Sequence, residues 1–252
     1  MSDSGLSARS VVASTLLGTV PPRLPGRLLV AFAEEFGIRP GTTRTALSRM
    51  VDRGELTHLD GGAYALAGEL LERHHRQEAG LHPSARAWDG TWEMVIVPAG
   101  ARSSADRAAL RRACAHLGMA ERRDGVWLRP ANLDPQRLPS AARVVATQAE
   151  RWTGRPDDDG RALVAELFDL DRWASRAAGL IDAMAADVDS LAGGFVLAAD
   201  ALRHLVSDPV LPLELAPAGW PASELRSAYA AYSARYQASL RDFFRAELAA
   251  VE

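Results

Sequence analysis

Lysine is absent from this 252-residue chain, so all 29 basic residues are arginine. The single cysteine, Cys114, excludes a disulfide within the chain and suits a reducing compartment. No apolar run approaches the roughly 20 residues that a membrane span needs. The GxSxG, HExxH, Rossmann and P-loop signatures are also missing, which weakens the case for an enzyme. We therefore expect a cytoplasmic protein without a membrane segment.

The length and the distribution of charge predict several modules with different functions. A chain of 252 residues exceeds the usual size of one domain, so two or three modules are expected. The net charge of -3 arises at the C-terminal end, where residues 161–252 contain 8 arginines and 13 acidic residues. Phosphate groups would repel such a segment, so its expected role is dimerisation or effector sensing rather than DNA contact.

The N-terminal residues have the signals of a helix-turn-helix. A first apolar helix is predicted over residues 8–18, and the prolines of PPRLPG after it predict a turn. A second amphipathic helix ends at Gly37, which occupies a C-terminal cap position. A third helix begins at Pro40, where a missing N–H costs nothing, runs to Arg53 and stops at Gly54.

The third helix has one apolar and one polar face. At a period of 3.6 residues, the inward positions are Thr43, Ala46, Leu47, Met50 and Val51, and the outward ones are Thr42, Arg44, Thr45, Ser48 and Arg49. Hydroxyls and arginines can reach base edges and phosphates. The candidate DNA-binding residues are Thr42, Thr43, Arg44, Thr45, Ser48, Arg49 and Arg53. A polar helix face can also be merely solvated, and small helix-turn-helix units also serve as protein-interaction modules.

A hairpin is predicted directly after this helix. Leu56 to His58 and Ala63 to Leu66 are short alternating runs that flank Asp60, Gly61 and Gly62. A recognition helix followed by a hairpin is the arrangement of a winged helix-turn-helix. The sequence therefore predicts DNA binding at this end of the chain.

A polar helix over Glu69 to Gln77 is predicted to connect this module to the next. His74 and Glu78 share one face of it and His82 lies nearby, so a metal site is conceivable. No cysteine or second spaced cluster completes the coordination, so a solvated connector is favoured and no metal is expected.

The middle of the chain predicts a mixed module. Trp92 to Val97 has the pattern of a buried strand. Ser104 to Leu117 has the pattern of a helix, in which Cys114 is expected to be a small buried residue. Met119 to Arg122 and Gly125 to Arg129 have the pattern of the two strands of a hairpin. Arg143 to Ala149 is predicted as a further strand, with a short helix possible at 139–142. The order predicts a ferredoxin-like split βαβ domain.

The last third predicts helices over Leu163 to Val188, Phe195 to Leu205 and Pro221 to Leu248. Its aromatic residues could line an acyl pocket or form core and dimer interface: Trp220, Tyr229, Tyr232, Tyr236, Phe243 and Phe244. Candidate cationic partners of an anionic ligand are Arg203, His204, Arg226 and Arg235. The fold class is α+β and multidomain, with expected divisions at 1–67 (winged helix), 68–86 (connector), 87–155 (ferredoxin-like) and 160–252 (helical).

Several motifs, taken in order, resemble the PaaX family of transcriptional regulators. They are TLLG at 15–18, RTALSRMVDRGEL at 44–56, WDGTWEMVIVP at 88–98, RAALRRACAHLGM at 107–119, GVWLRP at 125–130 and DPVLPLELAPAGWP at 208–221. The resemblance covers nearly the whole chain, and the last motif is the most specific. Two positions depart from the family pattern: Gly219 where an acidic residue commonly precedes Trp220, and Glu55 in place of a common tryptophan.

The resemblance implies a dimeric repressor with a winged helix, a central domain similar to a CRISPR-associated nuclease fold, and a helical C-terminal domain. It further implies a palindromic double-stranded DNA operator and release by an aryl-acyl coenzyme A thioester. Cleavage of DNA would need a metal-binding carboxylate at the end of the first strand, but Pro98 follows Val97 there. Asp89 and Glu93 lie at the other end, and Asp157 to Asp159 lie in a predicted turn.

The sequence thus favours a homodimeric, DNA-binding repressor of a catabolic operon with an acyl-CoA effector, and with no cofactor or catalytic residue. Alternatives are a winged-helix module that binds protein, and an enzyme acting on a CoA thioester or nucleic acid. No residue can be assigned as a ligand contact.

Overall fold

The computed structural model describes residues 6–98, 100, 102–157, 159–186 and 190–249. The chain divides into two compact units, each assembled from separate parts of the sequence. Unit 1 comprises Met1–His75, Ala183–Asp200 and Ala228–Glu252, and unit 2 comprises Arg76–Asp182 and Ala201–Ser227. The C-terminal third of the chain therefore contributes residues to both units.

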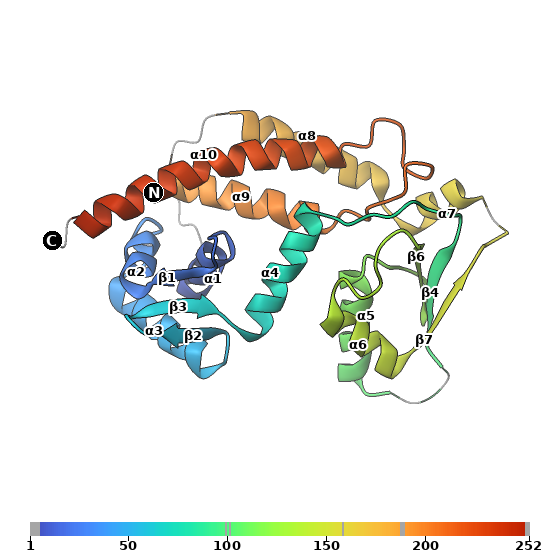
Figure 1. Cartoon of the computed structure of the whole chain (residues 1–252), viewed down its shortest axis with the longest axis horizontal. Helices are drawn as coiled ribbons and strands as arrows, with labels where there is room; N and C mark the ends of the chain where they lie inside the picture. Colours follow the sequence, from blue (N-terminus) through green and yellow to red (C-terminus); the bar gives the residue numbers. More distant parts are fainter. Residues whose placement is uncertain (1–5, 99, 101, 158, 187–189, 250–252) are drawn as a thin grey trace. The chain divides into compact units, whose positions relative to one another are not determined.

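The N-terminal part of unit 1 is a winged helix, with three helices around a small antiparallel sheet (Figure 1). Its elements are α1 (Ala8–Leu17), β1 (Arg23–Pro25), α2 (Gly26–Glu34), α3 (Pro40–Asp52), β2 (Leu56–Leu59) and β3 (Ala63–Leu66). The helices bury one apolar stripe each, and Leu16, Leu29 and Met50 are at most 1% exposed. This packing fixes α3 in place and leaves its polar face in solvent.

Strand β1 corrects the expectation of a simple turn at PPRLPG. Leu24 pairs with Tyr64 of β3, so β3 is the central strand of three. A three-residue strand that ends in proline carries too few residues to show alternation, and proline is tolerated because β1 is an edge strand. The buried side chain of Leu24 joins the core of the winged helix.

Parts of two C-terminal helices, α9 (Leu191–Val206) up to Asp200 and α10 (Ala222–Ala249) from Ala228, complete the core of unit 1. Phe32 of α2 is fully buried, and its ring makes edge-on contacts with Phe195 of α9 and with Phe243 and Phe244 of α10. Val11 of α1 belongs to the same cluster. The winged helix is therefore packed against residues from the other end of the chain.

Unit 2 contains the four-stranded antiparallel sheet, in the order β5-β6-β4-β7. Its elements are β4 (Trp92–Ile96), α5 (Ser104–His116), β5 (Ala120–Arg123), β6 (Val126–Pro130), α6 (Pro139–Gln148), β7 (Glu150–Gly154) and α7 (Gly160–Leu167). Helices α5 and α6 cover one face, where Val95, Trp127 and Leu110 meet, and α7 covers the other beside Trp92 (Figure 1). The order of elements confirms the ferredoxin-like prediction.

The predicted strand over Arg143 to Ala149 is wrong, because this segment belongs to α6. Its adjacent valines gave a strand-like pattern, but Pro139 starts a helix whose Ala141, Ala142 and Val145 face α5. The fourth strand, β7, follows at Glu150 to Gly154 and is mostly exposed. It lacked an apolar signal because it is an edge strand with one polar face.

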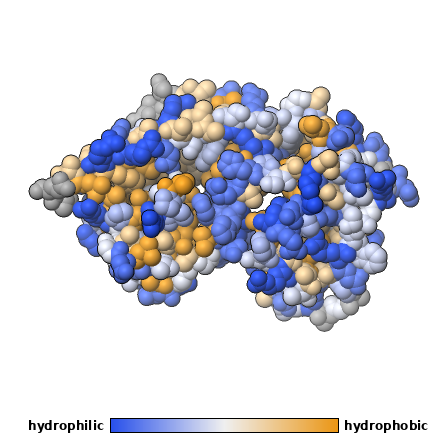
Figure 2. Space-filling view, in the orientation of Figure 1, coloured by the Kyte–Doolittle hydropathy of each residue, from blue (hydrophilic) through white to orange (hydrophobic). Residues whose placement is uncertain are grey.

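The helix predicted over Leu163 to Val188 is two helices, α7 and α8 (Leu170–Ala185). Asp169 begins the second by accepting a hydrogen bond from Arg172 N. The last two residues of the predicted helix, 187 and 188, lie outside the described residues. The connector helix α4 (Gly68–Leu81) is longer than predicted, since Ala79 still packs on the core of unit 2. Figure 2 shows a largely hydrophilic surface over α4.

Across the described residues, no helix combines the length and the apolarity that crossing a bilayer would require.

Cys114 is expected to be unreactive in the folded protein. Its side chain is fully buried in α5, and burial raises the pKa of the thiol to about 12, so the thiolate is scarce at pH 8. Treatment with an alkylating reagent should label the native chain at least about 100-fold more slowly than the chain in urea. Equal rates by mass spectrometry would contradict the packing of α5.

Candidate nucleic-acid interface

The polar face of α3 is the candidate interface. Pro40 starts the helix, and Arg39 before it has the extended backbone of an N-cap residue. The solvent-facing side chains match the sequence prediction: Thr42, Arg44, Thr45, Ser48, Arg49 and Arg53 are all exposed. The Thr45 hydroxyl donates to Gly41 O at 2.9 Å, which leaves its lone pairs to accept a bond from a ligand.

Thr43 must be removed from the candidate set. Its side chain is completely buried, and its Oγ1 has no hydrogen-bond partner among the described residues. The helical period places it on the inward face, so it cannot touch DNA without unpacking α3. The remaining six residues form one continuous exposed stripe.

A groove of 710 Å³ lies beside this stripe. Four arginines and no acidic residue line it: Arg9, Arg39, Arg49 and Arg53. Thr42 and Thr45 lie along the same groove. A cationic groove beside a recognition helix suits the phosphate backbone, because arginine can donate two bonds to one phosphate.

Arg9 and Arg39 line the groove but were not among the DNA-binding residues predicted from the sequence. Arg39 could have been found, since it directly precedes the Pro40 that marks the helix start. Arg9 lies on α1, far away in sequence, and no local pattern connects it to α3.

Arg9 is held in position by Glu55. The guanidinium makes two bonds to the carboxylate, Nε to Oε2 at 2.8 Å and Nη2 to Oε1 at 3.0 Å. This hydrogen bonding, with the charge of Glu55, raises the pKa of Arg9. Glu55 is the residue that departs from the family pattern. The carboxylate of Glu55 therefore pairs with Arg9, and this ion pair connects the start of α1 to the turn after α3.

The wing is the hairpin of β2 and β3. Leu59 pairs with Ala63, and the loop between them contains Gly61 and Gly62, both with positive φ of 77° and 76°. His58 and Tyr64 face each other across the strands with ring centroids 4.9 Å apart. The wing thus presents two glycines at its tip and a pair of aromatic rings across its strands.

The possible catalytic carboxylates have other partners. Asp89 accepts bonds from Thr91 N and Oγ1, and these bonds lower its pKa. Glu93 is 3.4 Å from Arg151. Asp159 caps α7 through Arg161 N, while Asp158 lies outside the described residues. Over the described ranges, no three His, Cys, Asp or Glu side chains gather as a metal site, and this includes His74, Glu78 and His82.

The aromatic residues of the C-terminal third are divided between the two units. Trp220 belongs to unit 2, where it stacks on Trp173 at 4.7 Å, whereas Tyr232, Phe243 and Phe244 belong to unit 1. The Tyr232 hydroxyl donates to Gly194 O at 3.1 Å, and the phenylalanines pack on Phe32. These contacts agree with the interpretation of these residues as core, and an acyl pocket stays a prediction.

The proposed cationic partners are also dispersed. Arg235 donates to Met184 O in unit 1, and Arg226 pairs with Asp208 in unit 2 at 2.7 Å. His204 stacks on Trp173 with centroids 4.5 Å apart. Asp208 and Trp220 lie near the two ends of the most specific sequence motif, and Trp220 Nε1 donates a hydrogen bond to Asp208 Oδ1 at 3.4 Å.

The fold and the arginine-lined helix define a winged helix-turn-helix protein with an additional ferredoxin-like domain. Residues 7–70 match the family model of the PaaX-like protein, and residues 85–157 match that of the PaaX protein central Cas2-like domain. The chain belongs to the PaaX family, and is thereby a member of a family of transcriptional regulators.

The chain is also similar to a solved structure, the uncharacterized protein Rv0674 from Mycobacterium tuberculosis. The two share 39% sequence identity over 95% of this chain and 99% of that one, with a TM-score of 0.72. No protein with a curated description is similar enough to count as a match.

Proposed function

We propose that this chain is a DNA-binding repressor that acts in the cytoplasm as a homodimer on a palindromic operator. The observation that carries the proposal is the exposed stripe of α3 beside a groove lined by four arginines and no acid. The stripe supplies groups that can reach base edges, and the groove supplies cations for the adjacent phosphates.

Dimerisation follows from the modest charge of one winged helix. Residues 1–65 contain 7 arginines and 6 acidic residues, so a single copy has little net attraction for DNA. Two copies joined by their acidic, helical parts would place two α3 helices on successive major-groove faces, about 34 Å apart. A palindrome with that spacing is the expected operator.

Release by an effector, such as an acyl-CoA thioester, is the proposed mode of control. The effector would favour an arrangement of the two copies in which the α3 helices no longer fit the operator. Thermodynamic linkage requires effector and operator to weaken each other by the same factor. Calorimetric titrations of each in the presence of the other test this, and independent binding would refute it.

The first experiment is a gel-shift titration with the DNA that flanks the gene. The dimer is expected to bind one site with a dissociation constant in the nanomolar range, and to lose affinity steeply with salt. With roughly eight phosphate contacts per dimer, log K should fall with log salt at a slope of about -7. Binding that is absent at every salt concentration would favour a protein-interaction module instead.

A further inference from the structure

A second cationic site lies within unit 2, well separated in the sequence from the residues of α3. It is a cavity of 410 Å³ whose lining contains one carboxylate, Asp208. Its basic side chains are four arginines and two histidines: Arg76, Arg129, Arg137, Arg203, His82 and His116. Such an excess of positive charge around a hollow is the chemistry of an anion site.

The one carboxylate in the lining is already neutralised. Asp208 Oδ2 lies 2.7 Å from Nη2 of Arg226, which does not line the cavity. Its Oδ1 accepts bonds from Val210 N at 3.1 Å and from Trp220 Nε1 at 3.4 Å. Asp208 is therefore held by partners of its own, and its charge raises the pKa of Arg129 less than burial lowers it.

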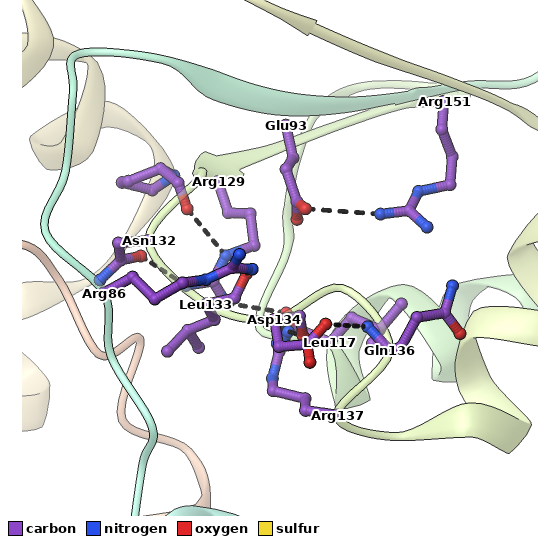
Figure 3. Close-up of polar contacts among 11 residues, drawn as sticks. Arg86, Glu93, Leu117, Arg129, Asn132, Leu133, Asp134, Gln136, Arg137 and Arg151 are labelled. Carbon is purple, nitrogen blue, oxygen red and sulfur yellow. Dashed lines mark hydrogen bonds and ion pairs between the residues drawn. The ribbon is translucent and has the colours of Figure 1, made fainter.

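Arg129, on the central strand β6, is the most buried of these arginines, with 1% exposure. Its guanidinium donates only to neutral oxygens, Nη1 to Leu117 O, Nη2 to Asn132 Oδ1 and Nε to Pro130 O, at 2.8 to 3.0 Å (Figure 3). A guanidinium has five N–H donors, so two remain without an acceptor in the described part of the chain. Burial, followed by the charge of Arg137, lowers the pKa of Arg129 to about 9.

Arg137 brings a second guanidinium to the same place. Its Nη2 donates to the same Leu117 carbonyl as Arg129, and its Nη1 donates to Asp134 O at 2.9 Å. Gly118 permits this approach, since a Cβ on it would lie 2.7 Å from Nη1 of Arg129. Glu93, opposite Arg129 on β4, instead bonds Arg151 (Figure 3). Neither guanidinium has a carboxylate within ion-pair distance among the described residues.

Arg129 is buried and Arg137 is half-buried, so holding these two cations together without an ion-pair partner is costly to the folded state, and a bound anion would lower that cost. We propose that this cavity binds a phosphate group, carried by a small organic ligand or as the free ion. A pair of guanidiniums binds a phosphate dianion better than it binds a single carboxylate, because the phosphate offers more oxygens as acceptors. The volume is that of a small-molecule site, and the apolar Leu133, Leu138 and Val210 offer contacts to an organic part. The proposal does not depend on DNA binding by α3.

The test is the melting temperature of the full chain in inorganic phosphate, AMP, acetate or chloride at equal ionic strength. Phosphate at roughly a hundredfold excess over its dissociation constant should raise the melting temperature by about 5 °C, while acetate should not. A rise at lower concentrations of AMP than of phosphate identifies an organic ester, and a rise with phosphate alone identifies the free ion. Equal effects of phosphate and acetate would overturn the proposal.

Variants locate the effect. Arg137→Gln should abolish the phosphate-dependent rise and should melt no lower than the parent in chloride, because it removes a like charge beside Arg129. If that variant does not fold, Arg203→Gln at the rim should weaken the phosphate affinity about tenfold. Arg111→Gln, which is exposed and outside the cavity, is the matched control and should keep the full rise.

A double variant, Arg44→Ala with Arg49→Ala, separates this site from the candidate DNA interface. It should lose operator binding and keep the phosphate effect. A phosphate effect that disappears in this variant and persists in Arg137→Gln would place the anion on α3 and refute the cavity as the site.

Discussion

Replacing Phe32 with alanine is expected to lower the free energy of unfolding by about 3–5 kcal/mol, which is a large share of the stability of a typical domain. Phe32 is fully buried, and four other phenylalanine rings surround it with centroids 5.4 to 6.1 Å away. The substitution removes these edge-on contacts and leaves a cavity that rigid helices cannot fill. Urea unfolding followed by circular dichroism measures the loss, since all six tryptophans lie in unit 2 and would not report on unit 1 by fluorescence.

Phe32→Leu is the matched control, because it keeps most of the apolar volume. We expect it to cost about 1 kcal/mol. If Phe32→Ala cost no more than Phe32→Leu, the ring would not be part of a packed core, and the assignment of α9 and α10 to unit 1 would be wrong.

Arg44→Ala and Arg49→Ala are each expected to weaken operator binding by roughly 10- to 100-fold, with the melting temperature changed by less than about 1 °C. Both side chains are exposed on α3, and neither makes a hydrogen bond or ion pair with another described residue. Their removal therefore costs the folded state little, whereas an arginine at a base edge or phosphate supplies one or two charged bonds. Gel shift and differential scanning fluorimetry give the two quantities.

Arg241→Ala on α10 is the control for these variants, since it removes the same charge from another exposed position of unit 1. It should leave operator affinity within about twofold. Removing an arginine that contacts phosphate should reduce the slope of log K against log salt by about one. Removing an arginine that contacts a base should instead weaken the preference for the operator sequence. A variant of α3 that behaves like Arg241→Ala would show that its face does not contact DNA.

Local signals were enough to predict the three helices and the hairpin of the winged helix, but not its edge strand β1. Pro40 and Gly54 delimit α3, and the glycines after Asp60 predict the hairpin, because each demands a backbone conformation that neighbouring residues cannot override. Where the signal was weak, the prediction failed. The edge strand β7 is mostly polar, and the valines at 144 and 145 favoured a strand although Pro139 begins a helix there.

Contacts between distant segments could not be predicted. The sequence gives no reason for Phe195 and Phe243 to pack on Phe32 rather than on each other in a separate helical domain. The proximity of Arg129 and Arg137 could not be predicted either, because both guanidiniums donate to the backbone carbonyl of Leu117 and a backbone contact leaves no sequence pattern. The groove on α3 was only half predicted for the same reason, because Arg9 reaches it from α1.

The core that α2 shares with α9 and α10 also bears on how the protein is made. Phe32 leaves the ribosome about 210 residues before Phe243 and Phe244, which pack against it. At synthesis rates of about 5–20 residues per second, the winged helix waits on the order of ten seconds or more for these partners. During that time its apolar cluster of Val11 and Phe32 stays uncovered. A nascent chain cut short by a premature stop before these partners would therefore release a winged helix that lacks the contacts covering Phe32, and we expect such fragments to be degraded.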